Sequence, residues 1–96
     1  MKFSCRNKRI LVTGGLGSIG SELVSQLLKL GPEKLLILDN RETEAMDRFR
    51  EFQNNSAIEI IFGDVRDRYL LSRLCRNIDI IYHAAAMKHV VICELN

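Results

Sequence analysis

The sequence lacks the features that mark several large classes of protein. Its 96 residues include no tryptophan and one proline, and no apolar run approaches the ~20 residues of a membrane-spanning helix. The first six residues contain no apolar segment of the kind found in signal peptides. Linkers, repeats and low-complexity tracts are also missing. We therefore expect one domain, residues 1–96, located in the cytoplasm.

Cysteine is scarce and the net charge is low. Cys5, Cys75 and Cys93 are far apart, none forms a CxxC pair, and no histidine stands at a metal-ligand spacing from them. We expect free thiols in a reducing compartment, with no metal site. The 14 basic and 12 acidic residues are mixed along the chain and give a net charge of +2. This balance argues against a nucleic-acid partner.

What the sequence does have is an alternation of short apolar runs with amphipathic stretches. The apolar runs predict buried strands at residues 9–13, 34–39, 58–62 and 79–83. Apolar side chains three or four residues apart predict helices at residues 18–30 and 42–53, and a third that Asp67 could cap. The order β-α-β-α-β-α-β predicts an α/β fold, the N-terminal half of a Rossmann-type doubly wound parallel sheet with strand order 3-2-1-4.

A glycine-rich segment joins the first predicted strand to the first helix. Gly14, Gly17 and Gly20 have the spacing GxxGxxG, and Ser18 and Ile19 stand where the helix begins. Glycine permits a sharp turn, close approach of the backbone to a pyrophosphate, and close packing of helix on strand. The helix N-terminus adds unpaired N–H groups and a positive potential. In this context a dinucleotide site is favoured over a glycine-rich turn without a ligand.

An acidic residue ends the second predicted strand, as dinucleotide sites require. Asp39 follows Gly20 by 19 residues, close to the usual ~20. Its carboxylate could accept hydrogen bonds from both hydroxyls of the adenosine ribose and would repel a 2′-phosphate, which favours NAD. Arg41 could instead hold that phosphate, so NADP is an alternative, and Asn40 belongs to the same subsite. Asp39 could also be only a turn residue.

The ends of the third and fourth predicted strands should meet at the same edge of the sheet. Asp64, followed by Val65, is placed to accept a hydrogen bond from the adenine amino group, or it could only cap the turn. The small side chains of Ala84, Ala85 and Ala86 would leave room for a flat cofactor, or they could serve tight helix–strand packing.

Two charged or titratable residues follow the alanine run. Lys88 and His89 are candidates for the substrate side of the site, because a cation there could contact phosphates of cofactor or substrate. An ordinary Lys-His pair on a surface loop is the alternative.

Three segments resemble a known family. Residues 13–20, TGGLGSIG, resemble the TGxxGxxG signature of extended short-chain dehydrogenases, and residues 63–67, GDVRD, resemble that family's adenine-side segment. Residues 83–90, HAAAMKHV, are similar to the HAAALKHVP segment of inverting UDP-N-acetylglucosamine 4,6-dehydratases and CapD-like polysaccharide biosynthesis proteins. Val91 stands where that pattern has proline. The resemblance runs from Lys8 to Glu94.

The resemblance implies an NAD(P)-dependent enzyme that acts on a UDP-N-acetylhexosamine in surface polysaccharide biosynthesis. In this family the cofactor takes hydride from C4 of the sugar and returns it at C6 after water has left. By analogy with the UDP-galactose 4-epimerases, Lys88 would lie near the phosphates and ribose of the cofactor. A fragment of a UDP-sugar 4-epimerase and a non-catalytic dinucleotide-binding module are the alternatives.

The catalytic tyrosine of this family belongs to a YxxxK motif, and the sequence contains no YxxxK motif. Neither Tyr69 nor Tyr82 is followed by lysine four residues later. We therefore expect the 96-residue chain to be inactive alone, because it stops before the catalytic motif and the substrate lobe. Its fourth strand would have an open apolar edge, which predicts self-association or a homo-oligomer.

Overall fold

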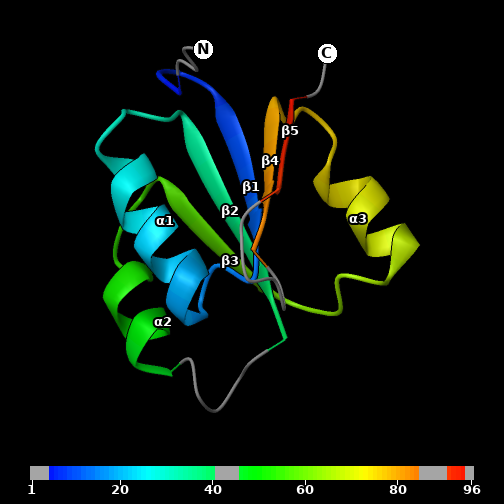
Figure 1. The fold of residues 1–96 in the computed structure, drawn as a ribbon, viewed down its shortest axis with the longest axis horizontal. Coiled ribbons are helices and arrows are strands. Elements are labelled where there is room, and N and C mark those ends of the chain that lie inside the picture. Colours follow the sequence, from blue (N-terminus) through cyan, green and yellow to red (C-terminus); the bar gives the residue numbers. More distant parts are fainter. Residues whose placement is uncertain (1–4, 41–45, 85–90, 95–96) are drawn as a thin grey trace.

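The computed structural model describes residues 5–40, 46–84 and 91–94 and shows one sheet with helices on both faces (Figure 1). In chain order, the elements are β1 (Arg9–Thr13), α1 (Ser18–Leu28), β2 (Lys34–Asp39), α2 (Met46–Phe52), β3 (Ile58–Phe62), α3 (Arg68–Leu74), β4 (Ile80–His83) and β5 (Val91–Glu94). Every predicted strand and helix has a counterpart in this series.

The strand order of the sheet is β3-β2-β1-β4-β5. β1 pairs in parallel with β2 and β4, and β2 pairs in parallel with β3, which confirms the predicted Rossmann-type order 3-2-1-4. Helices α1 and α2 cover one face and α3 covers the other (Figure 1), as right-handed crossovers require. Because β1 to β4 run in the same direction, their carboxyl ends meet at one edge, where ligands bind in sheets of this kind.

Helix α1 ends at Leu28, two residues before the predicted limit at Leu30. The N–H groups of Lys29 and Leu30 donate to carbonyls three residues back, and Gly31 has a φ of 73°. Hydrogen bonds that span three residues instead of four tighten the last turn, and the positive φ then turns the chain out of the helix. The predicted helix at 42–53 is observed as α2, and its first predicted turn falls in residues 41–45, outside the described residues.

The sequence did not predict β5, which lies antiparallel beside β4. Ile80 stands opposite Glu94, and His83 stands opposite Val91. The expectation of an open edge at β4 was therefore wrong. An unpaired strand edge offers a row of N–H and C=O groups, and here a later segment of the same chain bonds to them. The argument for self-association through this edge no longer holds.

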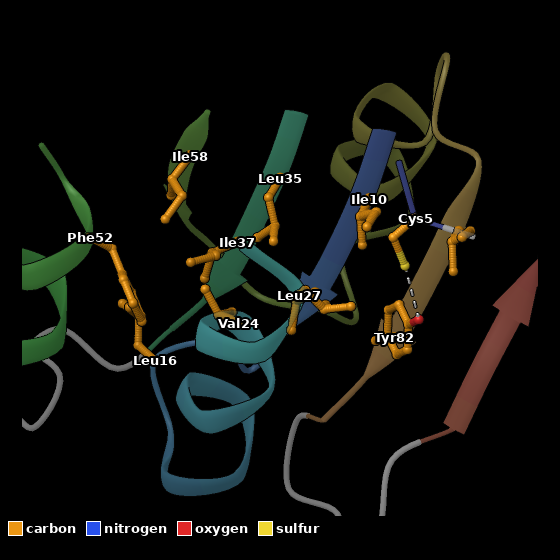
Figure 2. Packing of buried hydrophobic residues seen from close by; sticks show 12 residues of the cluster. Cys5, Ile10, Leu16, Val24, Leu27, Leu35, Ile37, Phe52, Ile58 and Tyr82 are labelled. Atoms are coloured by element: carbon orange, nitrogen blue, oxygen red, sulfur yellow. Dashed lines mark hydrogen bonds between the residues drawn. The ribbon is translucent and has the colours of Figure 1, made fainter. Parts of the chain in front are cut away.

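The larger cluster of buried side chains lies between the sheet and the layer formed by α1 and α2 (Figure 2). Its completely buried members are Ile10, Val12, Leu16, Val24, Leu35 and Ile37. At one end of this cluster, Cys5 Sγ lies 3.8 Å from the hydroxyl of Tyr82, so the segment before β1 packs on β4 (Figure 2). Burial, reinforced by this contact, raises the pKa of Tyr82 to about 12.

The opposite face of the sheet carries a smaller cluster under α3. Its buried members are Leu11, Leu36, Leu38, Ile78 and Ile81. Helix α3 adds Leu70, Leu71 and Leu74, which are only partly buried, and none of its residues is fully buried. Asp67 caps the helix as predicted, since its Oδ1 accepts the N–H of Leu70 at 3.1 Å. One short helix therefore covers this face loosely.

Candidate functional site

A cleft of about 450 Å³ opens at the carboxyl ends of the parallel strands. It is lined by Gly14, Gly17, Ser18, Ile19, Gly20, Leu38, Asp39, Asn40, Gly63, Asp64, Val65, Arg66 and Ala84. This set contains every predicted cofactor-binding residue that the structure describes. The remaining predicted positions, Arg41, Ala85, Ala86, Lys88 and His89, lie outside the described residues.

The glycine-rich loop from Gly14 to Gly17 forms the floor of the cleft, where β1 turns into α1. Gly14 has a φ of 73°, and its N–H donates to the carbonyl of Leu38 at 2.7 Å, which ties the turn to β2. A Cβ on Gly20 would overlap the carbonyl oxygen of Gly14 and lie 2.7 Å from its carbonyl carbon. Only glycine at position 20 therefore allows the first turn of α1 to rest directly against the turn at Gly14.

The N-terminus of α1 faces this cleft without a side-chain cap. The capping residue is Gly17, which has no side-chain oxygen to accept an N–H of the first turn. Ser18 and Ile19, the first two helical residues, are exposed on the cleft wall. Uncapped N–H groups together with the helix dipole favour an anion at this position.

Asp39 lies at the end of β2 and is buried, with 4% of its surface exposed. Its Oδ2 accepts the N–H of Leu16 in the glycine-rich loop at 2.9 Å. Leu16 is itself completely buried, and its carbonyl accepts a long, 3.5 Å hydrogen bond from Nη1 of Arg48 on α2. Asn40, the next residue, is exposed and lines the cleft. The acid predicted from its spacing thus lies beside the glycine-rich loop and is bonded to it.

Asp64 lies on the opposite wall, in the connection from β3 to α3. Its Oδ1 accepts the backbone N–H of Arg66 at 2.8 Å and Nε of the same residue at 3.2 Å, while Oδ2 accepts Nη2 at 2.9 Å. The side-chain bonds from Arg66, followed by its backbone N–H, lower the pKa of Asp64. A carboxylate has about four lone-pair positions, so this one keeps acceptor capacity for a donor in the cleft. Val65 follows Asp64 in the lining.

The end of β4 closes the remaining side of the cleft. Ala84 is buried, and its N–H donates to the carbonyl of Thr13 at 2.9 Å, which continues the pairing with β1. Next to it, Thr13 Oγ1 and His83 Nδ1 are 3.3 Å apart. Ala84 contributes a small side chain to the lining of the cleft.

Sequence reasoning missed Arg66 and Arg48 as parts of the site. Arg66 was visible as the fourth letter of GDVRD, and its position two residues after an aspartate in a turn is a signal that the two side chains can pair. Arg48 carried no such signal, because its approach to Leu16 depends on how α2 packs beside the loop.

Within residues 5–40, 46–84 and 91–94, no three His, Cys, Asp or Glu side chains are grouped so that they could hold a metal ion. None of the helices in the same ranges has the length and apolar character needed to cross a membrane.

Comparison with known proteins identifies relatives along nearly the whole chain. An uncharacterized membrane protein of Methanocaldococcus jannaschii is 46% identical over 91 residues, and a UDP-N-acetylglucosamine 4,6-dehydratase (inverting) of Campylobacter jejuni is 40% identical over 90. These alignments cover 95% and 93% of this chain, respectively, but only 27% of each relative. The chain therefore spans about a quarter of the length of the relatives it matches.

A solved structure and a family model agree with this placement. The Bordetella bronchiseptica enzyme WbmF in complex with NADH aligns with a TM-score of 0.70 and 28% identity, covering 86% of this chain and 24% of that one. The model of the family described as "Polysaccharide biosynthesis protein" matches residues 10–96. These matches confirm the resemblance to extended short-chain dehydrogenases. The chain belongs to the polysaccharide biosynthesis protein family.

Proposed function

We propose that this chain is the NAD-binding part of a nucleotide-sugar 4,6-dehydratase that acts on a UDP-N-acetylhexosamine. The observation that carries the proposal is the cleft, where an uncapped helix N-terminus, a buried acid and a second acid meet at one edge of the sheet. The names of two relatives support it, since one is a UDP-N-acetylglucosamine 4,6-dehydratase and the other is an enzyme in complex with NADH.

The residues of the cleft fit a dinucleotide in three parts. Gly14 turns the chain with a positive φ, Gly20 lets the first turn of α1 rest against that turn, and the N-terminus of α1 would offer N–H groups to a pyrophosphate. Asp39 and Asn40 would bind the hydroxyls of the adenosine ribose. Asp64 and Val65 would contact the adenine. When bound, NAD supplies the reversible hydride transfer that elimination of water from the sugar requires.

The buried carboxylate of Asp39 favours NAD over NADP, because a 2′-phosphate would bring a second negative charge against it. Arg41 is the residue that could reverse this preference. We assign Lys88 and His89 to the substrate side, where a cation would meet the phosphates of the UDP-sugar. The sequence has no YxxxK motif, so we propose that these residues do not supply the acid and base that act on the sugar. The chain alone is therefore expected to bind cofactor without turning over a sugar nucleotide.

Calorimetric titration of the purified chain with NAD+ and NADP+ tests the proposal. We expect saturable binding with a preference for NAD+, and a loss of roughly 10- to 100-fold in Asp39→Ala, the range for hydrogen bonds to a charged group. Asp79→Ala is a matched control, because Oδ2 of Asp79 also accepts a backbone N–H at 2.9 Å, from Arg9 at the amino end of the sheet. If neither nucleotide bound to a chain that circular dichroism showed to be folded, the proposal would be wrong.

A further inference from the structure

We propose that Asp39 has a second role, as the positioning residue of the glycine-rich loop. Through the N–H of Leu16, its carboxylate holds the loop in the shape that receives a pyrophosphate. This inference rests on the proposed function for the identity of the ligand. It goes beyond that function because it joins two subsites, ribose and pyrophosphate, through one side chain.

The first observation is that the hydrogen bond between Leu16 and Asp39 lies in the middle of the loop and is buried. Leu16 stands between Gly15 and Gly17, in the middle of the loop, and its N–H donates to Asp39 Oδ2 at 2.9 Å. Both residues are buried, with 0% of Leu16 and 4% of Asp39 exposed. A buried N–H that lost this acceptor would have no water to replace it, so the loop would have to rearrange.

The second observation is that Leu16 is fixed on its other sides as well. Its side chain packs in the cluster between the sheet and the α1–α2 layer, close to Phe52 of α2 (Figure 2). Its carbonyl accepts the hydrogen bond from Arg48. The side chain and carbonyl tie Leu16 to α2, and its N–H ties it to the end of β2. The bond from Gly14 to Leu38 holds the start of the loop to β2, and Asp39 holds its middle to the strand end where the ribose would bind.

The third observation is that the loop has little stiffness of its own. Glycines flank Leu16 on both sides, and Gly14 adopts a positive φ. Glycine has more backbone freedom than any other residue, so the ordered loop depends on contacts from outside it. A charged acceptor makes the stronger of such contacts, because hydrogen bonds to ionised groups are about twice as strong as neutral ones.

The two roles of Asp39 can be separated with a pair of ligands. ADP has both ribose hydroxyls. In contrast, 2′,3′-dideoxy-ADP keeps the pyrophosphate and the adenine but has no ribose hydroxyl that could donate a hydrogen bond to Asp39. Binding of both is measured by calorimetry to the wild-type chain, Asp39→Asn, Asp39→Ala and Asp79→Ala. Asparagine keeps an oxygen that can accept the N–H of Leu16, whereas alanine keeps none.

We expect Asp39→Ala to lower the affinity for dideoxy-ADP about tenfold, although this ligand has no ribose hydroxyl to donate to the carboxylate. The affinity of Asp39→Asn for dideoxy-ADP should stay within about threefold of the wild-type value, and most of the preference for ADP over dideoxy-ADP should be lost. Asp79→Ala should bind both ligands as wild type does. The inference is overturned if Asp39→Ala binds dideoxy-ADP as tightly as wild type, an outcome that leaves the ribose role intact.

Amide hydrogen exchange tests the loop without any ligand. The N–H of Leu16 should be protected in wild type and in Asp39→Asn, and it should exchange at least tenfold faster in Asp39→Ala while amides in β1 stay protected. Equal protection of Leu16 in Asp39→Ala and wild type would also overturn the inference. This measurement holds even if the wild-type chain binds neither nucleotide, so failure of the proposed function is told apart from failure of the loop role.

Discussion

The two walls of the cleft are built in different ways. The wall formed by the glycine-rich loop and α1 has a glycine that no other residue can replace, a buried carboxylate and a completely buried leucine. The wall formed by the β3–α3 connection is held by an exposed pair, in which 87% of the Arg66 side chain and 43% of the Asp64 side chain are accessible. The first wall is fixed by packing and the second by charges in solvent.

The same contrast extends into the layers behind each wall. Helix α1 has four buried residues and packs on the larger cluster, whereas α3 has none and packs on the smaller one. Substitutions on the two sides should therefore have unequal effects.

Gly20→Ala should have the largest effect, because the new methyl group would overlap backbone atoms of Gly14 rather than the end of a flexible side chain. We expect at least about 3 kcal/mol off the free energy of unfolding, the upper end for overpacking, and no measurable nucleotide binding. Gly17→Ala is the control. Its Cβ would lie 3.4 Å from the Gly14 oxygen, so only the N-cap preference, about 1 kcal/mol, should be lost. Urea denaturation decides whether position 20 behaves differently from position 17.

Truncating one leucine in each layer compares the packing directly. Leu27 on α1 has 4% of its surface exposed, and Leu74 on α3 is only partly buried. Leu27→Ala should cost about 2–5 kcal/mol of unfolding free energy, as for a buried leucine. Leu74→Ala should cost about 1 kcal/mol, because less surface returns to water. Equal losses in urea denaturation would mean that α3 is packed as firmly as α1.

Arg66→Ala should have the smallest effect on stability, since exposed ion pairs contribute little. The pKa of Asp64 should rise back toward its ordinary value, because the bonds from Arg66 that lower it are gone. In the wild type, a lowered folded pKa means that the pair stabilises the fold above the unfolded pKa and that this contribution disappears as acid titrates Asp64. An NMR pH titration of the Asp64 carboxyl group measures the shift.

The matched control for this variant is Arg68→Ala, which removes an exposed arginine at the start of α3 that does not line the cleft. It should leave the pKa of Asp64 where it is. In Arg66→Ala we also expect roughly threefold weaker nucleotide binding, because Asp64 is no longer held in one orientation. A pKa of Asp64 that stayed low after Arg66 was removed would show that the turn, rather than the pair, sets it.

The sequence alone predicted the fold and most of the cleft lining because both depend on local chemistry. Glycine at position 14 permits a positive φ, glycine at position 20 marks a place where a side chain cannot stand, and the apolar runs of β1, β2 and β4 mark strands buried on both faces. Asp39 could be found by counting from Gly20. Each of these signals is carried by the identity of one residue and its distance along the chain.

What the sequence could not predict depends on orientation. The bond from Leu16 to Asp39 joins residues 23 positions apart, and it exists only because the rotamer of Asp39 turns toward the loop. The pairing of β5 with β4 requires the chain to reverse direction, and the four residues of β5 have no periodicity that distinguishes a strand from a loop. Packing and chain reversal decide such contacts.

The central position of β1 affects how the chain is made. On one edge β1 pairs with β2, the next strand in the sequence. On the other edge it pairs with β4, where Ile10 stands opposite Ile80, 70 residues later. At a synthesis rate of about 5–20 residues per second, that edge stays uncovered for roughly 4–14 s as the chain leaves the ribosome. Pairings this distant also close slowly. Among the parallel strands, β1 is therefore the one whose edge waits longest for its partner during synthesis.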